Sequence, residues 1–200
     1  MKDFLYKLWS IFLTWFSKLK IFSSGHIIPI IAYDPSDPKV TGDDVIQIMG
    51  IIQPGDVLIR GFDKYLDGKF IPDPKGYSHA GIYIGNNHII HACSPEVQTI
   101  NVIDFCQCDR IMVLHPSMEK TSDGVKIAQD LIGTPYDFNY ESDNHMLYCF
   151  ELIAKCYPEA HMEEFEVKQL GGLIKRSCYI AKSIYLNPFF KTIYERNDLG

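Results

Sequence analysis

The 200-residue chain lacks the features that define several classes of protein. No dense cluster of Lys and Arg occurs, and the formal charge of −6 argues against a general nucleic-acid binder, so no nucleic-acid partner is expected. Internal repeats and low-complexity runs are also missing, so nothing divides the chain into repeating units. Because 46% of the residues are hydrophobic, we expect one sizeable core in a single globular domain with extensions.

Cysteine pairs of the kind that bind structural zinc are absent. The chain has six cysteines, which are Cys93, Cys106, Cys108, Cys149, Cys156 and Cys178. The one close pair, Cys106 and Cys108, has a spacing too short for a zinc knuckle, and no second pair completes a site. We therefore expect no metal and no cofactor. A reactive thiol persists best in a reducing compartment, so such a compartment is expected, and a cytoplasmic, membrane-associated location is one that fits.

What the chain does contain is a histidine on an alternating strand and, well downstream, a cysteine that opens an apolar helix. His79 begins the strand, and Cys149 follows the candidate N-caps Asp143 and Asn144. A cysteine attacks carbonyls as the thiolate, and both an imidazole and the positive end of a helix lower a thiol pKa. The pattern predicts Cys149 as a nucleophile and His79 as its base. The alternative is a small buried hydrophobic residue.

A second histidine, His91, lies on the next strand of a predicted hairpin. If the loop is the three residues Gly85–Asn87, Ile84 faces His88, and His91 shares a face of the sheet with His79. A two-residue loop would put the two histidines on opposite faces. On one face they would be diagonal neighbours, near enough for one imidazole to orient the other. The alternative is two ordinary, partly exposed strand histidines.

Five ordered sequence blocks carry a resemblance to a known family. They are Gly55-Asp56-Val57-Leu58, Tyr77–Gly85, Ile89–Ala92, Gly133–Asp137 and Tyr148–Ile153. Together they resemble the circularly permuted branch of the NlpC/P60 superfamily of papain-like cysteine hydrolases, and within it the YiiX/YebB-like group. In that branch the histidine precedes the cysteine, as here. The resemblance implies an α+β fold with an antiparallel sheet packed against helices, with Cys149, His79 and His91 as the catalytic residues.

Two positions depart from the pattern of this family. Many relatives have a glutamate where His91 stands, whereas the LRAT branch has histidine, and Phe150 replaces the serine that usually follows the cysteine. The resemblance implies hydrolysis of an amide bond in a cell-wall peptide or another small peptide. Two alternatives stay open, namely a lipid thioesterase or acyltransferase of LRAT type, and a non-enzymatic structural or virion component that keeps the fold.

The proposed chemistry also needs donors for the oxyanion. The backbone N–H of Cys149 is one candidate, and the hydroxyl of Tyr148 or of Tyr136 is a second. Both tyrosines have packing as the alternative role. Gly81 has no side chain and is expected to leave room for contact between the two imidazoles.

Residues 1–24 form a predicted amphipathic helix. Its polar stripe follows helical spacing and consists of Asp3, Lys7, Ser10, Thr14, Ser17 and Lys18. The remaining face is apolar and aromatic, with Trp9 and Trp15, which together with the lysines is typical of a helix at a membrane surface. The lysines and the missing cleavage site argue against a secretory signal. Docking on a partner protein, docking on its own domain and an uncleaved anchor are the alternatives.

The rest of the chain is predicted to consist of a segment over 25–54 and a hydrolase domain over 55–200. The segment contains a proline-rich linker at Tyr33–Pro38, followed by a short helix capped by Thr41 or Asp43. Predicted strands lie near 57–60, 78–84, 88–93, 97–102 and 110–114, and predicted helices near 122–132 and 147–157. Residues 165–190 carry helical and extended signals together.

Overall fold

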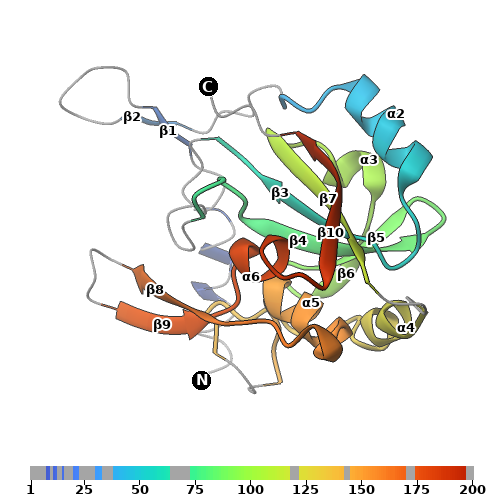
Figure 1. The fold of residues 1–200 in the computed structure, drawn as a ribbon. Coiled ribbons are helices and arrows are strands. Elements are labelled where there is room, and N and C mark those ends of the chain that lie inside the picture. The colour runs from blue at the N-terminus through green and yellow to red at the C-terminus, as the bar shows by residue number, and fades with distance from the viewer. Residues whose placement is uncertain are drawn as a thin grey trace.

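A computed structural model describes residues 8–9, 11–12, 15, 20–22, 30–32, 38–63, 73–117, 122–141, 145–169 and 174–196. Its centre is a six-stranded antiparallel sheet with the order β10-β7-β3-β4-β5-β6. Helices lie along both faces of this sheet (Figure 1). The predicted α+β class with an antiparallel sheet packed against helices is confirmed.

The strands of the central sheet are β3 Val57–Gly61, β4 His79–Gly85, β5 His88–Ala92, β6 Val97–Asn101, β7 Arg110–Pro116 and β10 Phe190–Arg196. The first five agree with the predicted strands to within two residues, because each is a short β-branched run bounded by turn residues. The last one, β10, was not predicted. It pairs with β7 at the edge of the sheet, with a register shift between Thr192 and Tyr194.

The remaining elements are two small strand pairs and the helices. The pairs are β1 Lys20–Phe22 with β2 Ile30–Ala32, and β8 Phe165–Gln169 with β9 Ile174–Cys178. The predicted helix over residues 1–24 was therefore wrong at residues 20–22, which pair with β2 as a strand. The helices are α2 Gly42–Ile51, α3 Val102–Phe105, α4 Ser122–Asp130, α5 Cys149–Cys156, the 3-10 turn η2 Pro158–Ala160 and α6 Ala181–Tyr185. Residues 165–190 thus do contain both strand and helix, as their mixed sequence signals indicated.

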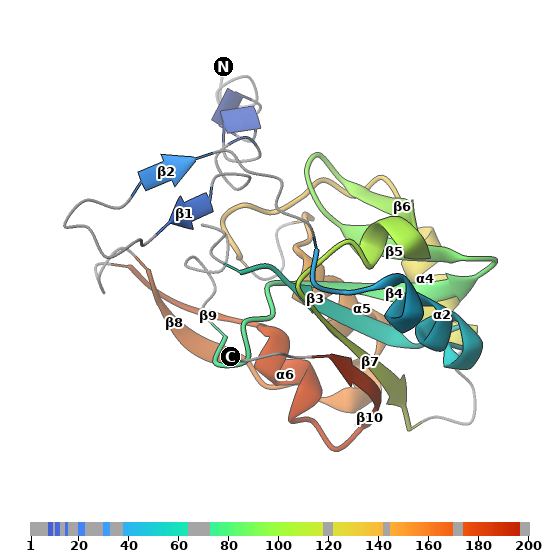
Figure 2. The ribbon, with the colours of Figure 1, turned by 90° about the horizontal axis from the view of Figure 1, so that it is seen from above.

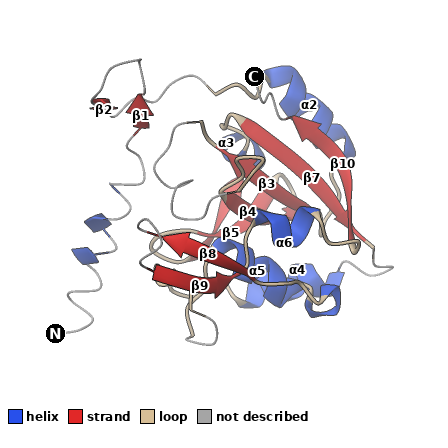
Figure 3. Ribbon diagram, turned by 60° about the vertical axis from the view of Figure 1, so that its left-hand side comes forward, coloured by secondary structure: helices blue, strands red, loops and turns tan. Residues whose placement is uncertain are grey.

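Two apolar cores lie on opposite faces of the sheet. One includes Ile59 and Ile82 from the sheet and Leu152 from α5, and the other includes Leu58 from the sheet with Ile48 from α2 and Phe105 from α3. The alternation along β3 therefore sends neighbouring residues to different cores. Figures 2 and 3 show α2 and α5 as separate elements flanking the sheet.

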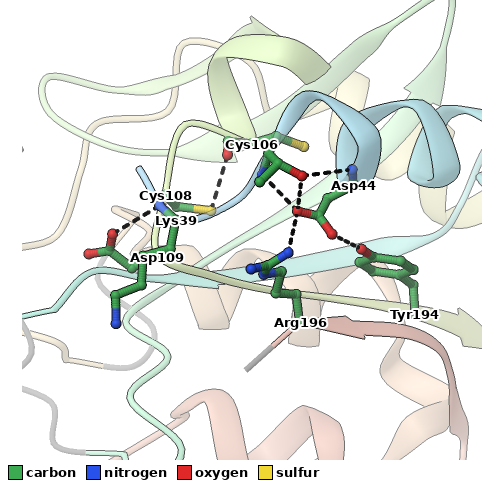
Figure 4. A network of polar contacts seen from close by, with 8 residues as sticks. Lys39, Asp44, Cys106, Cys108, Asp109, Tyr194 and Arg196 are labelled. Atoms are coloured by element: carbon green, nitrogen blue, oxygen red, sulfur yellow. Dashed lines mark hydrogen bonds and ion pairs between the residues drawn. The ribbon is translucent and has the colours of Figure 1, made fainter. Parts of the chain in front are cut away.

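A polar network ties α2 to the edge strand β10 (Figure 4). The helix begins with a capping box in which Thr41, one of the two predicted caps, and Asp44 satisfy each other's backbone N–H groups. Asp44 also accepts hydrogen bonds from Tyr194 Oη at 2.6 Å and Arg196 Nη1 at 2.9 Å. Burial alone would raise the pKa of Asp44, but these bonds hold that pKa well below its usual range. Part of the predicted segment 25–54 is thus joined to the sheet; residues 33–37 of the linker lie outside the described residues.

The start of α5 differs from the prediction. Its N-cap is Tyr148, with extended backbone angles and no capping side chain, so the predicted caps Asp143 and Asn144 were wrong. The first hydrogen bond within the helix runs from Leu152 N to Tyr148 O at 3.0 Å. Cys149 is therefore the first helical residue, and its N–H is one of the amides that the helix itself leaves unused.

The hairpin of β4 and β5 reaches the predicted register by a different route. Its turn has two residues, Asn86 and Asn87, both with positive φ, which is the geometry of a tight type I′ hairpin. The prediction that Ile84 faces His88 was wrong. Gly85 faces His88 instead, and the register shifts between Tyr83 and Gly85.

This shift is a bulge that adds one residue to β4. Beyond it, Ile82 faces Ile90, which is the pairing that the three-residue loop would have produced. A two-residue turn with one bulged residue is thus equivalent to a three-residue loop. For that reason the prediction that His79 and His91 share a face holds.

Candidate active site

The two predicted histidines meet in the structure. His79 Nε2 lies 2.8 Å from His91 Nδ1, and the two rings are nearly perpendicular, with 5.1 Å between their centroids. This contact occupies Nε2 of His79. The other nitrogen of that ring, Nδ1, takes no part in this contact.

A row of polar side chains crosses four strands on this face of the sheet. Arg60 on β3 is the cross-strand partner of His79 on β4, and His91 on β5 is the partner of Gln98 on β6. Cross-strand partners point to the same face, so these four side chains follow one another along one end of the sheet. The sequence prediction included two of them.

The Phe105 ring packs against three side chains of this polar row, His79, His91 and Arg60. Its ring centroid lies 5.7 Å from that of His79 and 6.0 Å from that of His91, and the guanidinium carbon of Arg60 lies 4.4 Å from it. Arg60 Nη1 also donates to the Phe105 carbonyl at 2.9 Å. The space beside Gly81 is filled by this ring and by Ile89, whose Cγ2 would lie 2.5 Å from an added Cβ. Because Gly81 has no side chain, the Phe105 ring can lie in this space, where it contacts both imidazoles.

The surroundings keep both imidazoles neutral. Burial, followed by the Arg60 guanidinium and by His91, lowers the pKa of His79 well below its ordinary value. Burial, followed again by Arg60, lowers the pKa of His91 to about 4. A neutral imidazole can accept a proton, which is what a general base requires near pH 7.

Cys149 adjoins the start of β4. Its Sγ lies 3.9 Å from the carbonyl oxygen of Ser78, the residue directly before His79, and the thiol is 2% exposed. Helix α5 packs against β4, which brings two segments 70 residues apart in the chain together. The structure thus places Cys149 against the residue that directly precedes His79, at the N-terminal end of a helix.

A second thiol lies on the far side of the histidine pair. Cys93 Sγ is 3.6 Å from His91 Nε2 and accepts a hydrogen bond from Gln98 Nε2 at 2.7 Å. Burial raises the pKa of Cys93, although Gln98 and Arg60 oppose that rise. The polar contacts therefore continue from His79 through His91 and Cys93 to Gln98.

The two tyrosines proposed as oxyanion donors occupy different surroundings. The hydroxyl of Tyr148 is buried in the core and accepts a hydrogen bond from Tyr179 N at 2.8 Å. The backbone N of Tyr136 donates to Pro95 O at 2.9 Å. Burial, then the negative charge that Tyr140, Cys149 and Cys93 can carry, raises the pKa of Tyr136 well above its usual value. A side-chain hydrogen bond with Tyr140 adds to this rise, so the Tyr136 phenol stays protonated.

The loop between Tyr136 and Tyr148 is held by a buried carboxylate. Asp137 is fully buried and accepts from Asn139 N and Glu141 N, each at 2.7 Å. Its own N–H donates to Leu147 O at 3.1 Å. These bonds join the Gly133–Asp137 block to the residues just before Cys149.

Cys106 and Cys108 are removed from this chemistry. Both are buried free thiols, and the Cys108 thiol donates to the carbonyl of Cys106 (Figure 4). It also donates to the carbonyl of Arg110. Burial raises the pKa of Cys106 to about 12. Among the described residues, no group of three or more His, Cys, Asp or Glu side chains is arranged to hold a metal ion.

A strand histidine, followed later in the chain by a cysteine that begins a helix packed on the same sheet, is the order of the permuted class of papain-like cysteine hydrolases. A family model described as "permuted papain-like amidase enzyme, YaeF/YiiX, C92 family" matches residues 51–185. That match covers more than half of the chain, so the protein belongs to this family of cysteine peptidases and amidases. The predicted class of enzyme is confirmed.

A solved structure shows the same fold. The crystal structure described as metalloprotein YiiX from Escherichia coli O157:H7 superposes with a TM-score of 0.59, at 17% sequence identity, over 72% of this chain and 97% of that chain. The predicted resemblance to the YiiX-like group is therefore confirmed. No curated protein matches the chain.

Proposed function

We propose that the protein hydrolyses an amide bond in a cell-wall peptide or another small peptide, with Cys149 as nucleophile. In the first step the thiol proton passes to Nδ1 of His79 while Sγ bonds to the carbonyl carbon. The same nitrogen then gives the proton to the leaving amine as the C–N bond breaks. Water, deprotonated by His79, releases the acid from the thioester and restores the thiol.

The hydrogen bonds around His91 support one particular set of tautomers. If His91 donates from Nε2 to Cys93 Sγ, its Nδ1 accepts from Nε2–H of His79. The lone pair of His79 Nδ1 is then free for the proton of Cys149. The amide of Gln98 fixes Cys93 in place for this contact. In this proposal His91, Cys93 and Gln98 are positioning residues that act through His79.

Two donors are assigned to the oxyanion. The backbone N–H of Cys149 is the first, since it lies at the first residue of the helix, where the aligned peptide dipoles favour negative charge. The Tyr136 hydroxyl is the second, because its environment keeps it protonated near Cys149. Tyr148 is assigned a structural role because its hydroxyl bonds to the backbone before α6.

The observation that carries this function is the contact of His79 with His91 beside a cysteine at the first residue of α5. The test is to incubate the protein with short cell-wall peptides and follow release of free amine and acid by mass spectrometry. Cleavage should leave a thioester on Cys149 that can be trapped and mapped in the intact protein. Cys149→Ala is the matched control, and cleavage that persists in it would contradict the proposal.

A second candidate function is transfer or hydrolysis of a lipid acyl group. The observation that favours it is a histidine at position 91 in contact with the base, which is the LRAT-type arrangement. Acyl thioesters offered to the same protein distinguish the two. Rapid thioester turnover without peptide cleavage would favour the lipid substrate.

A further inference from the structure

A ridge of exposed apolar side chains lies near the N-terminus. Residues 8–9, 11–12 and 15 are helical, and the spacing of Leu8, Ile11, Phe12 and Trp15 puts these four on one helix face. The exposed fractions are 49% for Leu8, 54% for Trp9, 59% for Ile11, 46% for Phe12 and 57% for Trp15. We call these five residues the apolar ridge.

Aromatic contacts make the ridge continuous. The rings of Trp9 and Phe12 stack with centroids 5.5 Å apart, and those of Phe12 and Trp15 lie 6.3 Å apart. Contiguous apolar surface of this kind on a folded protein marks an interaction site. The half-exposed side chains also show that burial in its own domain does not account for this face.

The charge of the segment identifies the kind of surface it fits. The first 24 residues carry four lysines and one aspartate, whereas the whole chain has a net charge of −6. An anionic surface therefore attracts this segment and repels the remainder. Tryptophan is enriched at the lipid–water interface, where an indole ring meets both acyl chains and headgroups, and both tryptophans of the chain are in the ridge.

We propose that residues 1–24 bind the surface of an anionic lipid bilayer. The apolar ridge enters the boundary between headgroups and acyl chains, and the lysines meet the lipid phosphates. No helix among the described residues is long and apolar enough to cross a membrane.

The intrinsic fluorescence of the full-length protein tests this proposal directly. Because Trp9 and Trp15 are the only tryptophans, their emission reports on the ridge alone. Vesicles of mixed phosphatidylcholine and phosphatidylglycerol should shift the emission to the blue and carry the protein into the pellet on sedimentation. Pure phosphatidylcholine vesicles should bind it more weakly, and added salt should weaken binding to the anionic vesicles.

Two double variants separate the apolar and the charged contributions. Leu8→Ser with Ile11→Ser keeps both tryptophans as probes and should weaken vesicle binding by about tenfold to a hundredfold. Lys7→Gln with Lys18→Gln should weaken binding to anionic vesicles by roughly tenfold and abolish the preference for them. The matched control is Ile46→Ser with Leu186→Ser, at aliphatic residues 70% and 60% exposed outside the ridge, which should bind as the parent does.

Three results would overturn the proposal. The first is an emission spectrum that does not change with either vesicle type. The second is a melting temperature that falls by several degrees in the Leu8→Ser, Ile11→Ser variant without loss of vesicle binding, which would place the ridge against its own domain. The third is self-association of the full-length protein that this variant abolishes, without affinity for vesicles, which would make the ridge a contact between copies of the chain.

Discussion

Two thiols lie near the residues of the histidine pair, Cys149 beside Ser78 and Cys93 beside His91, and their surroundings differ in position and in exposure. Cys149 is the first residue of a helix and lies beside the residue that precedes His79, whereas Cys93 follows a strand and contacts His91. Cys149 is buried and Cys93 is partly exposed.

The two cysteines show whether solvent exposure or position in the fold decides the reactivity of a thiol. If solvent access decided reactivity, Cys93 would react first. If the helix terminus and the neighbouring base decide it, Cys149 reacts first, since the aligned peptide dipoles stabilise a thiolate at the start of a helix. We expect position to decide, because burial raises the pKa of Cys93 without a helix to oppose it.

The largest expected effect is that of removing the nucleophile. Cys149→Ala should lower turnover by at least about 10⁴-fold, because no other group can form the covalent intermediate. The melting temperature should change little, since alanine fills most of the same space. Turnover of a peptide amide and thermal unfolding are the two measurements.

Cys93→Ala is the matched control for that variant. It removes a thiol that contacts His91 only as a positioning residue, so it should lower turnover by less than about tenfold, far less than Cys149→Ala does. Iodoacetamide near neutral pH, followed by peptide mapping, should label Cys149 first in the parent protein. A loss of activity greater in Cys93→Ala than in Cys149→Ala would exchange the roles of the two cysteines.

The next effect is that of the orienting histidine. His91→Ala should lower kcat by about 10²–10⁴-fold, because His79 loses the partner that sets its tautomer and ring position. His88→Ala is the control, since it removes an exposed imidazole from the start of the same strand. Similar losses in both variants would show that the damage comes from the hairpin itself.

The depressed pKa of His91 predicts a dependence of stability on pH. The unfolded chain has a histidine pKa near the ordinary value of 6.5, and the folded value is about 4. Below pH 6.5 the unfolded state binds more protons, so the contribution of His91 is full above pH 6.5 and is lost as the pH falls toward 4. It should reach about 3 kcal/mol.

Urea unfolding of the parent and of His91→Gln across this pH range measures that contribution as a difference between the two proteins. The Asp44 carboxylate does not interfere, because its pKa is lowered and its loss falls at a lower pH. A difference between the proteins that stays constant from pH 7 to about 4 would refute the neutral, buried state of His91.

The smallest expected effect is that of Gln98. Gln98→Leu removes the amide that donates to Cys93, and it should lower kcat by less than about tenfold, the worth of one hydrogen bond. The nitrogen chemical shifts of His91 should move toward a mixture of tautomers, which a merely structural change would not produce. Gln98→Glu tests the same contact with an acceptor in place of the donor. Unchanged shifts in both variants would remove Cys93 and Gln98 from the positioning role.

The five strands from 57 to 116 were predictable because each run alternates or is continuously apolar between turn residues. The face shared by His79 and His91 was predictable for a related reason, since the side-chain period of a strand is two. The turn itself was not. Its two asparagines and the bulge after Tyr83 depend on how the strand ends twist against each other, and the same register follows from either geometry.

The start of α5 and the presence of Arg60 in the polar row could not be predicted from the sequence. A side-chain cap at Asp143 or Asn144 was the local expectation, but α5 starts at Cys149 without one, and its packing on β4 accompanies that start. Arg60 follows a predictable strand, yet its partnership with His79 spans the connection from 61 to 78, whose length leaves the register open. Local sequence patterns do not reach that far.

The sequence by itself determined the candidate residues for the chemistry and the class of fold, because strand periodicity and the order of histidine and cysteine can be read along the chain. Tertiary structure alone decided their environment. Phe105 reaches the imidazoles from a short helix 26 residues after His79. Burial, and then the Arg60 guanidinium on β3, lowers the pKa of both rings. Burial and charge act through space, between residues that only the folded chain brings together.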